Sequence, residues 1–128
     1  MENIRSSASS EIERMKLLVL KQLKEYGSFH PTLLFSLGCL ARMRQQRREY
    51  TKAERIYRRA LELCAHSPEA QTHVVRMLAA GYASLLCATG RVELAAWLRE
   101  KIKVYLSSLH EEPMPRWEQL ACKVACLN

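Results

Sequence analysis

The apolar residues of this chain recur every three or four positions along several segments, a spacing that places them on one face of an α-helix. Gly27 and Gly90 fall between these segments. Residues 1–9 precede the first segment, so we expect a disordered start followed by a single helical domain over residues 10–128. The pattern predicts an all-α fold of about six helices, over residues 10–25, 32–47, 51–64, 67–88, 92–108 and 115–128.

Short motifs mark where some of these helices begin. Residues 10–13 and 51–54 match the capping box, in which a Ser or Thr side chain accepts a backbone amide and the acid three residues later reaches back. Ser67 before Pro68 matches an N-cap followed by proline at the first helical position. These motifs agree with the helices predicted from the apolar spacing.

The apolar pattern also repeats at a step of 42 residues. The phrase apolar-x-x-apolar-Ala begins at Leu37, Ala79 and Ala121. In the same register, Ala53 precedes Ala95 by 42 positions. A period of this size is typical of stacked helical hairpins, whose usual role is binding rather than catalysis.

Residues 53–63, with two alanines seven apart and an aromatic residue between them, resemble the second helix of a tetratricopeptide repeat (TPR). His30-Pro31 and the 42-residue step are similar to the long repeat of the kinesin light chain type. The resemblance implies a right-handed array with two full repeats and a half repeat at each end. Departures from the family pattern are Arg44 at an apolar position, Arg48 where a glycine would make the turn, and Arg99 at an aromatic position.

In this family the first helices of the hairpins line a concave groove, and the resemblance implies which residues would do so here. Arg42, Gln45 and Gln46 would supply polar contacts, and Phe35 and Met77 apolar anchors. The alternative is that the glycines in the set simply admit a neighbouring helix. The implied groove positions are Phe35, Gly38, Cys39, Arg42, Gln45, Gln46, Met77, Ala80, Gly81, Ser84, Cys87, Gln119, Cys122 and Lys123.

Positive charge is concentrated in one hairpin. Residues 42–59 hold eight basic and two acidic residues, which is +6 of the chain's net +7. The cluster fits an acidic protein partner, nucleic acid, or a solvated face with Glu54–Arg58 and Arg58–Glu62 pairs. We expect Tyr50 and Tyr57 in the core, where they could not stack on bases. A nucleic-acid interface would use the basic patch of Arg47, Arg48, Lys52, Arg55 and Arg59.

The sequence carries no pattern for catalysis or for a cofactor. It has no aspartate, and it lacks a phosphate-binding loop, a dinucleotide fingerprint and a nucleophile elbow. The five cysteines lie at helical positions among apolar neighbours, so we expect reduced thiols and no metal site. The chain is therefore expected not to be an enzyme and to have no cofactor.

Residues 77–90 form an uncharged stretch that is too short to span a bilayer, and no secretory signal is apparent. These features predict an intracellular, cytoplasmic protein without membrane contact. The last predicted helix has an apolar face with no following hairpin, so we expect a homodimer or an obligate complex there. That face consists of Trp117, Leu120, Val124 and Leu127.

Taken together, the repeat, the groove and the charge predict a non-catalytic protein–protein interaction module. It would act as an adaptor, chaperone or assembly factor and bind a peptide or protein segment, with an acidic segment as one candidate. The alternative from a different class is a basic helical protein that associates with nucleic acid through residues 42–59.

Overall fold

The computed structural model describes residues 3–66 and 72–107, with side chains from Ser10 onward. These ranges contain five helices and no strand, which confirms the all-α prediction for this part of the chain. The predicted sixth helix and the Ser67-Pro68 motif lie outside the described residues. The helices are α1 (Asn3–Tyr26), α2 (Pro31–Gln46), α3 (Tyr50–Ala65), α4 (Thr72–Ala88) and α5 (Val92–Ser107).

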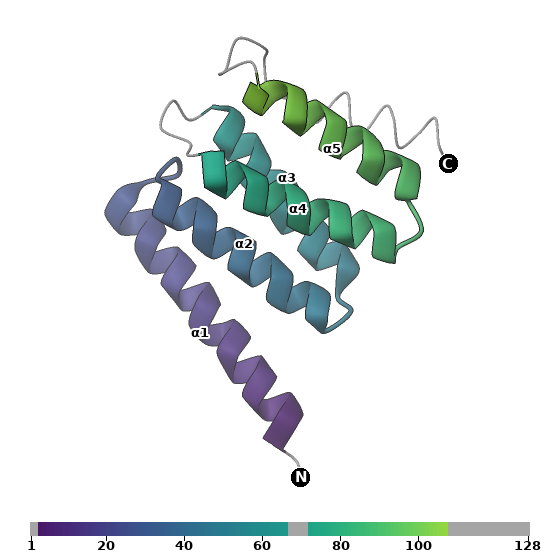
Figure 1. The fold of residues 1–128 in the computed structure, drawn as a ribbon. Coiled ribbons are helices and arrows are strands. Elements are labelled where there is room, and N and C mark those ends of the chain that lie inside the picture. Colours follow the sequence, from purple (N-terminus) through teal and green to yellow (C-terminus); the bar gives the residue numbers. More distant parts are fainter. Residues whose placement is uncertain (1–2, 67–71, 108–128) are drawn as a thin grey trace.

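Each helix packs against the next along the chain, and α2 also packs against α4. Figure 1 shows α2 and α4 side by side with α3 behind them, while α1 and α5 lie at opposite edges. This arrangement makes α2 and α4 neighbours on the side away from α3. Any surface that both helices share is therefore built from residues about 42 positions apart in sequence.

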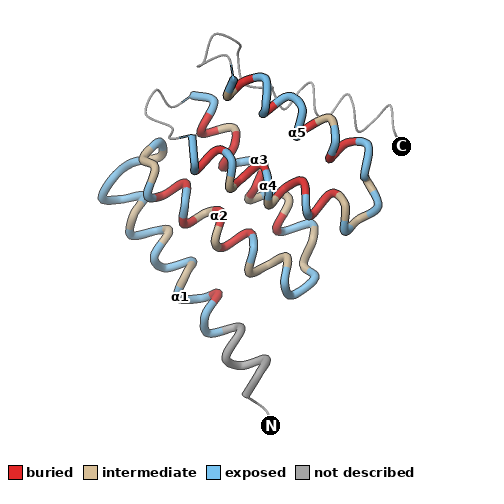
Figure 2. Tube along the Cα trace, in the orientation of Figure 1, coloured by how far each residue is buried: buried red, intermediate tan, exposed pale blue. Residues whose placement is uncertain are grey.

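The hydrophobic core runs through α2, α3, α4 and α5, as the buried residues in Figure 2 show. Tyr57 and Tyr82 lie inside it, with parallel rings whose centroids are 6.0 Å apart. The buried residues of α5 lie at helical spacing along one face of the helix. They are Leu94, Ala95, Leu98, Ile102 and Tyr105.

The α2–α3 and α4–α5 turns have the same backbone structure. In the first, Arg48 N–H donates to the Gln45 carbonyl (2.9 Å) and its φ is +62°. In the second, Gly90 N–H donates to the Cys87 carbonyl (3.1 Å) and its φ is +82°. Arg48 therefore takes the left-handed conformation that the family pattern gives to glycine.

Two predicted helix starts differ from the structure. The first helix begins at Asn3 rather than Ser10, so residues 3–9 are helical. The capping box at residues 51–54 is wrong, because α3 is preceded by Glu49 as N-cap, without a side-chain cap bond. At α2 the predicted start holds, with His30 as N-cap accepting the Thr32 amide at Nδ1 (3.1 Å).

Candidate functional site

A groove of about 630 Å³ lies between α2 and α4, with the side chains of two α3 tyrosines at its base. It contains every groove position that the sequence predicted on α2, and on α4 it contains all of them except Cys87. Gln119, Cys122 and Lys123 lie outside the described residues. The lining is Phe35, Gly38, Cys39, Arg42, Gln45, Gln46, Tyr50, Tyr57, Met77, Ala80, Gly81, Ser84 and Ala88.

Two glycines keep the helices of the groove close to their neighbours. A Cβ built on Gly81 would lie 2.6 Å from the Tyr57 hydroxyl oxygen and 2.7 Å from its Cε1. A Cβ on Gly38 would overlap the Met77 methyl group and lie 3.0 Å from Leu78 Cδ2. Close packing therefore explains both glycines without reference to a ligand.

A chain of hydrogen bonds crosses the groove from α3 to α2 to α4. The Tyr57 hydroxyl donates to Gln45 Oε1 (3.2 Å), and Gln45 Nε2 donates to Ser84 Oγ (3.3 Å). Burial raises the pKa of Tyr57, and the nearby positive charge of Arg42 opposes the shift only in part. The neutral hydroxyl is therefore kept as a donor, which fixes the Gln45 amide across the groove.

The rim of the groove combines apolar and polar side chains. The groove is lined by Phe35 on α2, which is 48% exposed, and by the partly buried Met77 on α4. Arg42 and Gln46 are also exposed on α2. Burial raises the pKa of Cys39, with Arg42 opposing, so this thiol remains protonated at neutral pH. The surface thus offers apolar contact beside one cation and the exposed amide of Gln46.

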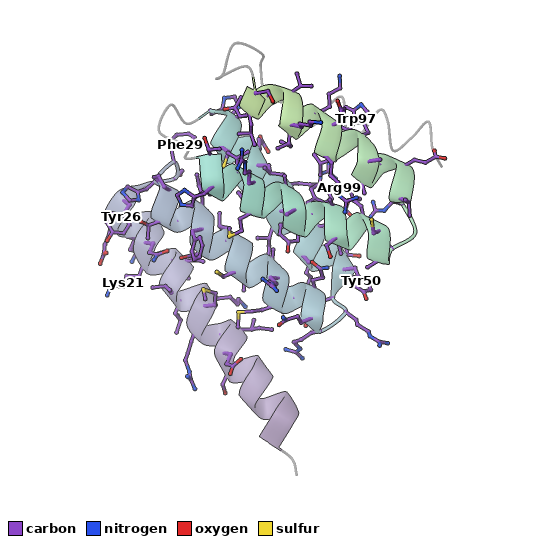
Figure 3. The ribbon with its side chains drawn as sticks, viewed as in Figure 1. Lys21, Tyr26, Phe29, Tyr50, Trp97 and Arg99 are labelled. Carbon is purple, nitrogen blue, oxygen red and sulfur yellow. The ribbon has the colours of Figure 1, made fainter. Side chains whose placement is uncertain are left out.

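Sequence reasoning placed Tyr50 and Tyr57 in the core and missed their part in the groove. Tyr50 lies at the start of α3, beside the end of α2, as Figure 3 shows. Tyr57 is both 2% exposed and part of the groove base. The repeat register could have predicted this part. An aromatic side chain on the second helix of a hairpin packs beneath two neighbouring first helices, and so it borders the space between them.

The basic patch does not belong to the groove. Glu49 binds Arg47 (3.3 Å) and Lys52 (3.5 Å), and also Arg44 at 2.8 Å. Arg59 pairs with Glu62 at 3.6 Å. Glu49 and Glu62 therefore pair with four of the eight basic residues of this hairpin, which keeps a net positive charge.

The side chains of the basic patch are exposed and lie away from the groove. Helical spacing places Lys52, Arg55 and Arg59 on the side of α3 opposite Tyr57, and all three are exposed. Arg48 lies in the turn after α2 and is exposed as well. The patch and the groove are two separate surfaces.

Glu54 has a role that the sequence did not reveal. Its carboxylate accepts two hydrogen bonds from Arg91, Nη2 to Oε1 at 2.6 Å and Nη1 to Oε2 at 3.1 Å. The Tyr82 hydroxyl donates to the same Oε2 (3.1 Å). Burial alone would raise the pKa of Glu54, but the Arg91 hydrogen bonds and charge outweigh it and leave the pKa lowered. Glu54 thus links α3 to the turn before α5, and the nearby charge of Arg58 also helps to lower its pKa.

The other predictions concern the apolar face of the last helix, metal binding and membrane contact. Trp117, Leu120, Val124 and Leu127 are outside the described ranges. Within residues 3–66 and 72–107, no group of three His, Cys or Glu side chains could hold a metal ion. In the same ranges no helix is long and apolar enough to cross a membrane.

Comparison of the chain with protein-family models, curated proteins and solved structures finds no match.

Proposed function

We propose that this chain is a non-catalytic protein-interaction module that holds a peptide or protein segment in the groove between α2 and α4. The observation that carries the proposal is the groove itself, whose lining contains all six α2 positions and four of the five α4 positions inferred from the repeat register. Its volume of about 630 Å³ is within the usual size of a binding pocket.

The described hairpins support a TPR-type array with a 42-residue repeat. The turn residues Arg48 and Gly90, both with positive φ, are separated by that step. Likewise, α5 begins 42 residues after the start of α3 and ends 42 residues after the end of α3. In such arrays the concave face is a binding surface, so this relation favours recognition over catalysis.

The chemistry of the groove suits a polypeptide. Phe35 and Met77 offer apolar contact, while the amide of Gln46 and the guanidinium of Arg42 can bind backbone carbonyls or a carboxylate. The Gln45 amide is already held by Tyr57 and Ser84, so part of the surface is ordered before a ligand arrives. An adaptor, a chaperone or an assembly factor would each use such a surface.

The test is selection of peptides from a random display library on the whole protein, followed by affinity measurements on a synthetic selected peptide. We expect Arg42→Glu to weaken binding about tenfold or more, because it reverses the cation in the groove. Arg55→Glu is the matched control, since it makes the same charge change on the far side of α3. Binding is expected to change less than about twofold in that control.

Two results would count against the proposal. One is that no peptide is enriched. The other is that Arg42→Glu leaves binding unchanged, whereas the protein binds a random single-stranded oligonucleotide with a steep salt dependence. In that case Arg55→Glu and Lys52→Glu would abolish oligonucleotide binding. The second result would favour nucleic-acid association through the exposed side of α3.

A further inference from the structure

A second pocket, of about 360 Å³, lies between α4 and α5 directly beside the groove. Ala80 lines both cavities, so the two are neighbours on one continuous face of α4. The second pocket takes no part in the predicted binding set, apart from this shared residue. Its lining is Arg76, Ala79, Ala80, Arg99, Ile102, Lys103, Leu106 and Ser107.

Three cations surround this pocket. Arg76, Arg99 and Lys103 are exposed, and no carboxylate is among the described lining residues. None of the three forms an ion pair with a residue in ranges 3–66 and 72–107. Arg99 extends from α5 toward α4, where it makes a weak contact of 3.9 Å with Cys87 Sγ (Figure 3). Within the described ranges the cations of this pocket therefore have no carboxylate partner, in contrast to those around Glu49.

The floor of the pocket is apolar. Ala79 and Ile102 are nearly buried, and the partly buried Leu106 completes the surface between the cations. A ligand that fits must bring negative charge together with aliphatic groups. Glutamate side chains do this, because their methylene groups can cover the floor while the carboxylates reach the guanidinium and ammonium groups.

We propose that the pocket between α4 and α5 is an acidic subsite, which takes Glu or Asp residues of the same protein segment that lies in the groove. This inference rests on the proposed function and adds the charge of the partner to it. Continuity through Ala80 allows one segment to occupy both cavities. Bases have no aromatic partner for stacking among the described lining residues, which favours an acidic polypeptide over nucleic acid.

The experiment compares a selected peptide that contains acidic residues with a version in which each acid is replaced by its amide. Wild-type protein should bind the acidic version about tenfold more tightly, as expected for two or three partly exposed charge pairs. In the double variant Arg99→Glu/Lys103→Glu this preference should disappear. The amide version should bind wild type and variant equally, because its groove contacts are unchanged.

The double variant Arg55→Glu/Lys101→Glu is the matched control. It makes the same change in net charge at two exposed cations that line neither cavity. The preference for the acidic peptide should survive in this control, which separates the subsite from a general attraction to a basic protein. The helical CD signal and melting temperature of both variants establish that they are folded.

Three results would overturn the inference. If peptides are selected and depend on Arg42, but carry no acidic residues or keep their preference in Arg99→Glu/Lys103→Glu, the groove stands and the subsite fails. If no peptide is selected, both proposals fail together. If a random single-stranded oligonucleotide binds through Arg99 and Lys103 while the acidic peptide does not, the pocket binds phosphate groups rather than carboxylates.

Discussion

Arg48 holds a backbone conformation that L-residues other than Asn and Asp seldom adopt. Its φ of +62° places it in the left-handed region, at the same step of the turn where Gly90 has φ +82°. The turn geometry is fixed by its neighbours, since Glu49 N–H donates to the Arg44 carbonyl (2.9 Å) and their side chains pair. These contacts of Glu49 with Arg44 therefore offset the conformational strain at Arg48.

Replacing Arg48 by glycine should therefore stabilise the protein. We expect Arg48→Gly to raise the free energy of unfolding by about 0.5–1 kcal/mol, because glycine adopts the conformation without a Cβ clash. Gly90→Ala should lower it by about 1 kcal/mol, although a Cβ there has no atom within 4 Å to meet. Urea unfolding followed by circular dichroism measures both. A loss of stability in both variants, or in neither, would argue against equivalent turns.

Gly38 and Gly81 differ in what a methyl group would meet. At Gly81 the obstacle is the buried ring of Tyr57, whereas at Gly38 it is mainly the flexible end of Met77. We expect Gly81→Ala to lower the free energy of unfolding by about 1–3 kcal/mol. Gly38→Ala should cost less than about 1 kcal/mol, since alanine favours the helix and Met77 can move. Thermal unfolding of the two variants provides the comparison, and a costlier Gly38→Ala would refute it.

At the scale of the elements, the Glu54–Arg91 pair ties α3 to the α4–α5 turn. The side chains are 18% and 25% exposed and meet at two hydrogen bonds. Glu54→Gln should lower the free energy of unfolding by about 1–3 kcal/mol, because it leaves the Arg91 charge unpaired in a partly buried place. Glu62→Gln removes the exposed partner of Arg59 and should cost less than about 0.5 kcal/mol. Denaturant unfolding of the two variants tests this, and equal costs would contradict it.

The sequence predicted the helices well because their signals are local or periodic. The bounds of α2 and α5 agree to within one residue with the ranges predicted from the apolar spacing. The capping box at residues 51–54 failed because α3 begins at Tyr50, which places Thr51 inside the helix, and Glu54 is bound by Arg91, which lies 37 positions away. A local motif cannot reveal such a competing long-range partner.

The groove could be predicted from the sequence, but the second pocket could not. The groove positions on α2 and α4 follow from register alone, since two neighbouring first helices present the same face. The cations around the second pocket were not found, because Arg76 and Arg99 come from different helices and form no run in the sequence. The basic cluster predicted from the sequence was instead the dense run at residues 42–59, in which Glu49 pairs with three of the cations.

For the whole molecule, the shifted pKa values predict a stability that falls at both ends of the pH scale. Burial raises the pKa of Glu49, but its pairs with Arg44, Lys52 and Arg47 outweigh this, and the folded pKa of both Glu49 and Glu54 lies below 4.5. Their contribution is present above about pH 4.5 and is lost as the pH falls through the folded pKa. Burial raises the pKa of Cys64 from 9.0 to about 12, so stability is lost as the pH rises through that interval.

Chemical denaturation as a function of pH measures this profile. Glu54→Gln should flatten the decline on the acid side, because the variant has no carboxylate to protonate at that position. Cys64→Ala should reduce the decline between pH 9 and about 12, although its lower core volume reduces stability at every pH. A profile with the same slopes in wild type and both variants would rule out these groups as the cause.

The central claim is that the face between α2 and α4 binds a protein segment, and the four glycines of the chain report on it directly. Gly38 and Gly81 line the groove, whereas Gly27 and Gly90 lie in turns outside it. The measurement is a nitrogen–proton NMR titration of the labelled protein with a selected peptide. We predict that the Gly38 and Gly81 amide signals shift in proportion to occupancy while those of Gly27 and Gly90 remain in place. Unmoved Gly38 and Gly81 signals at saturation would contradict the account.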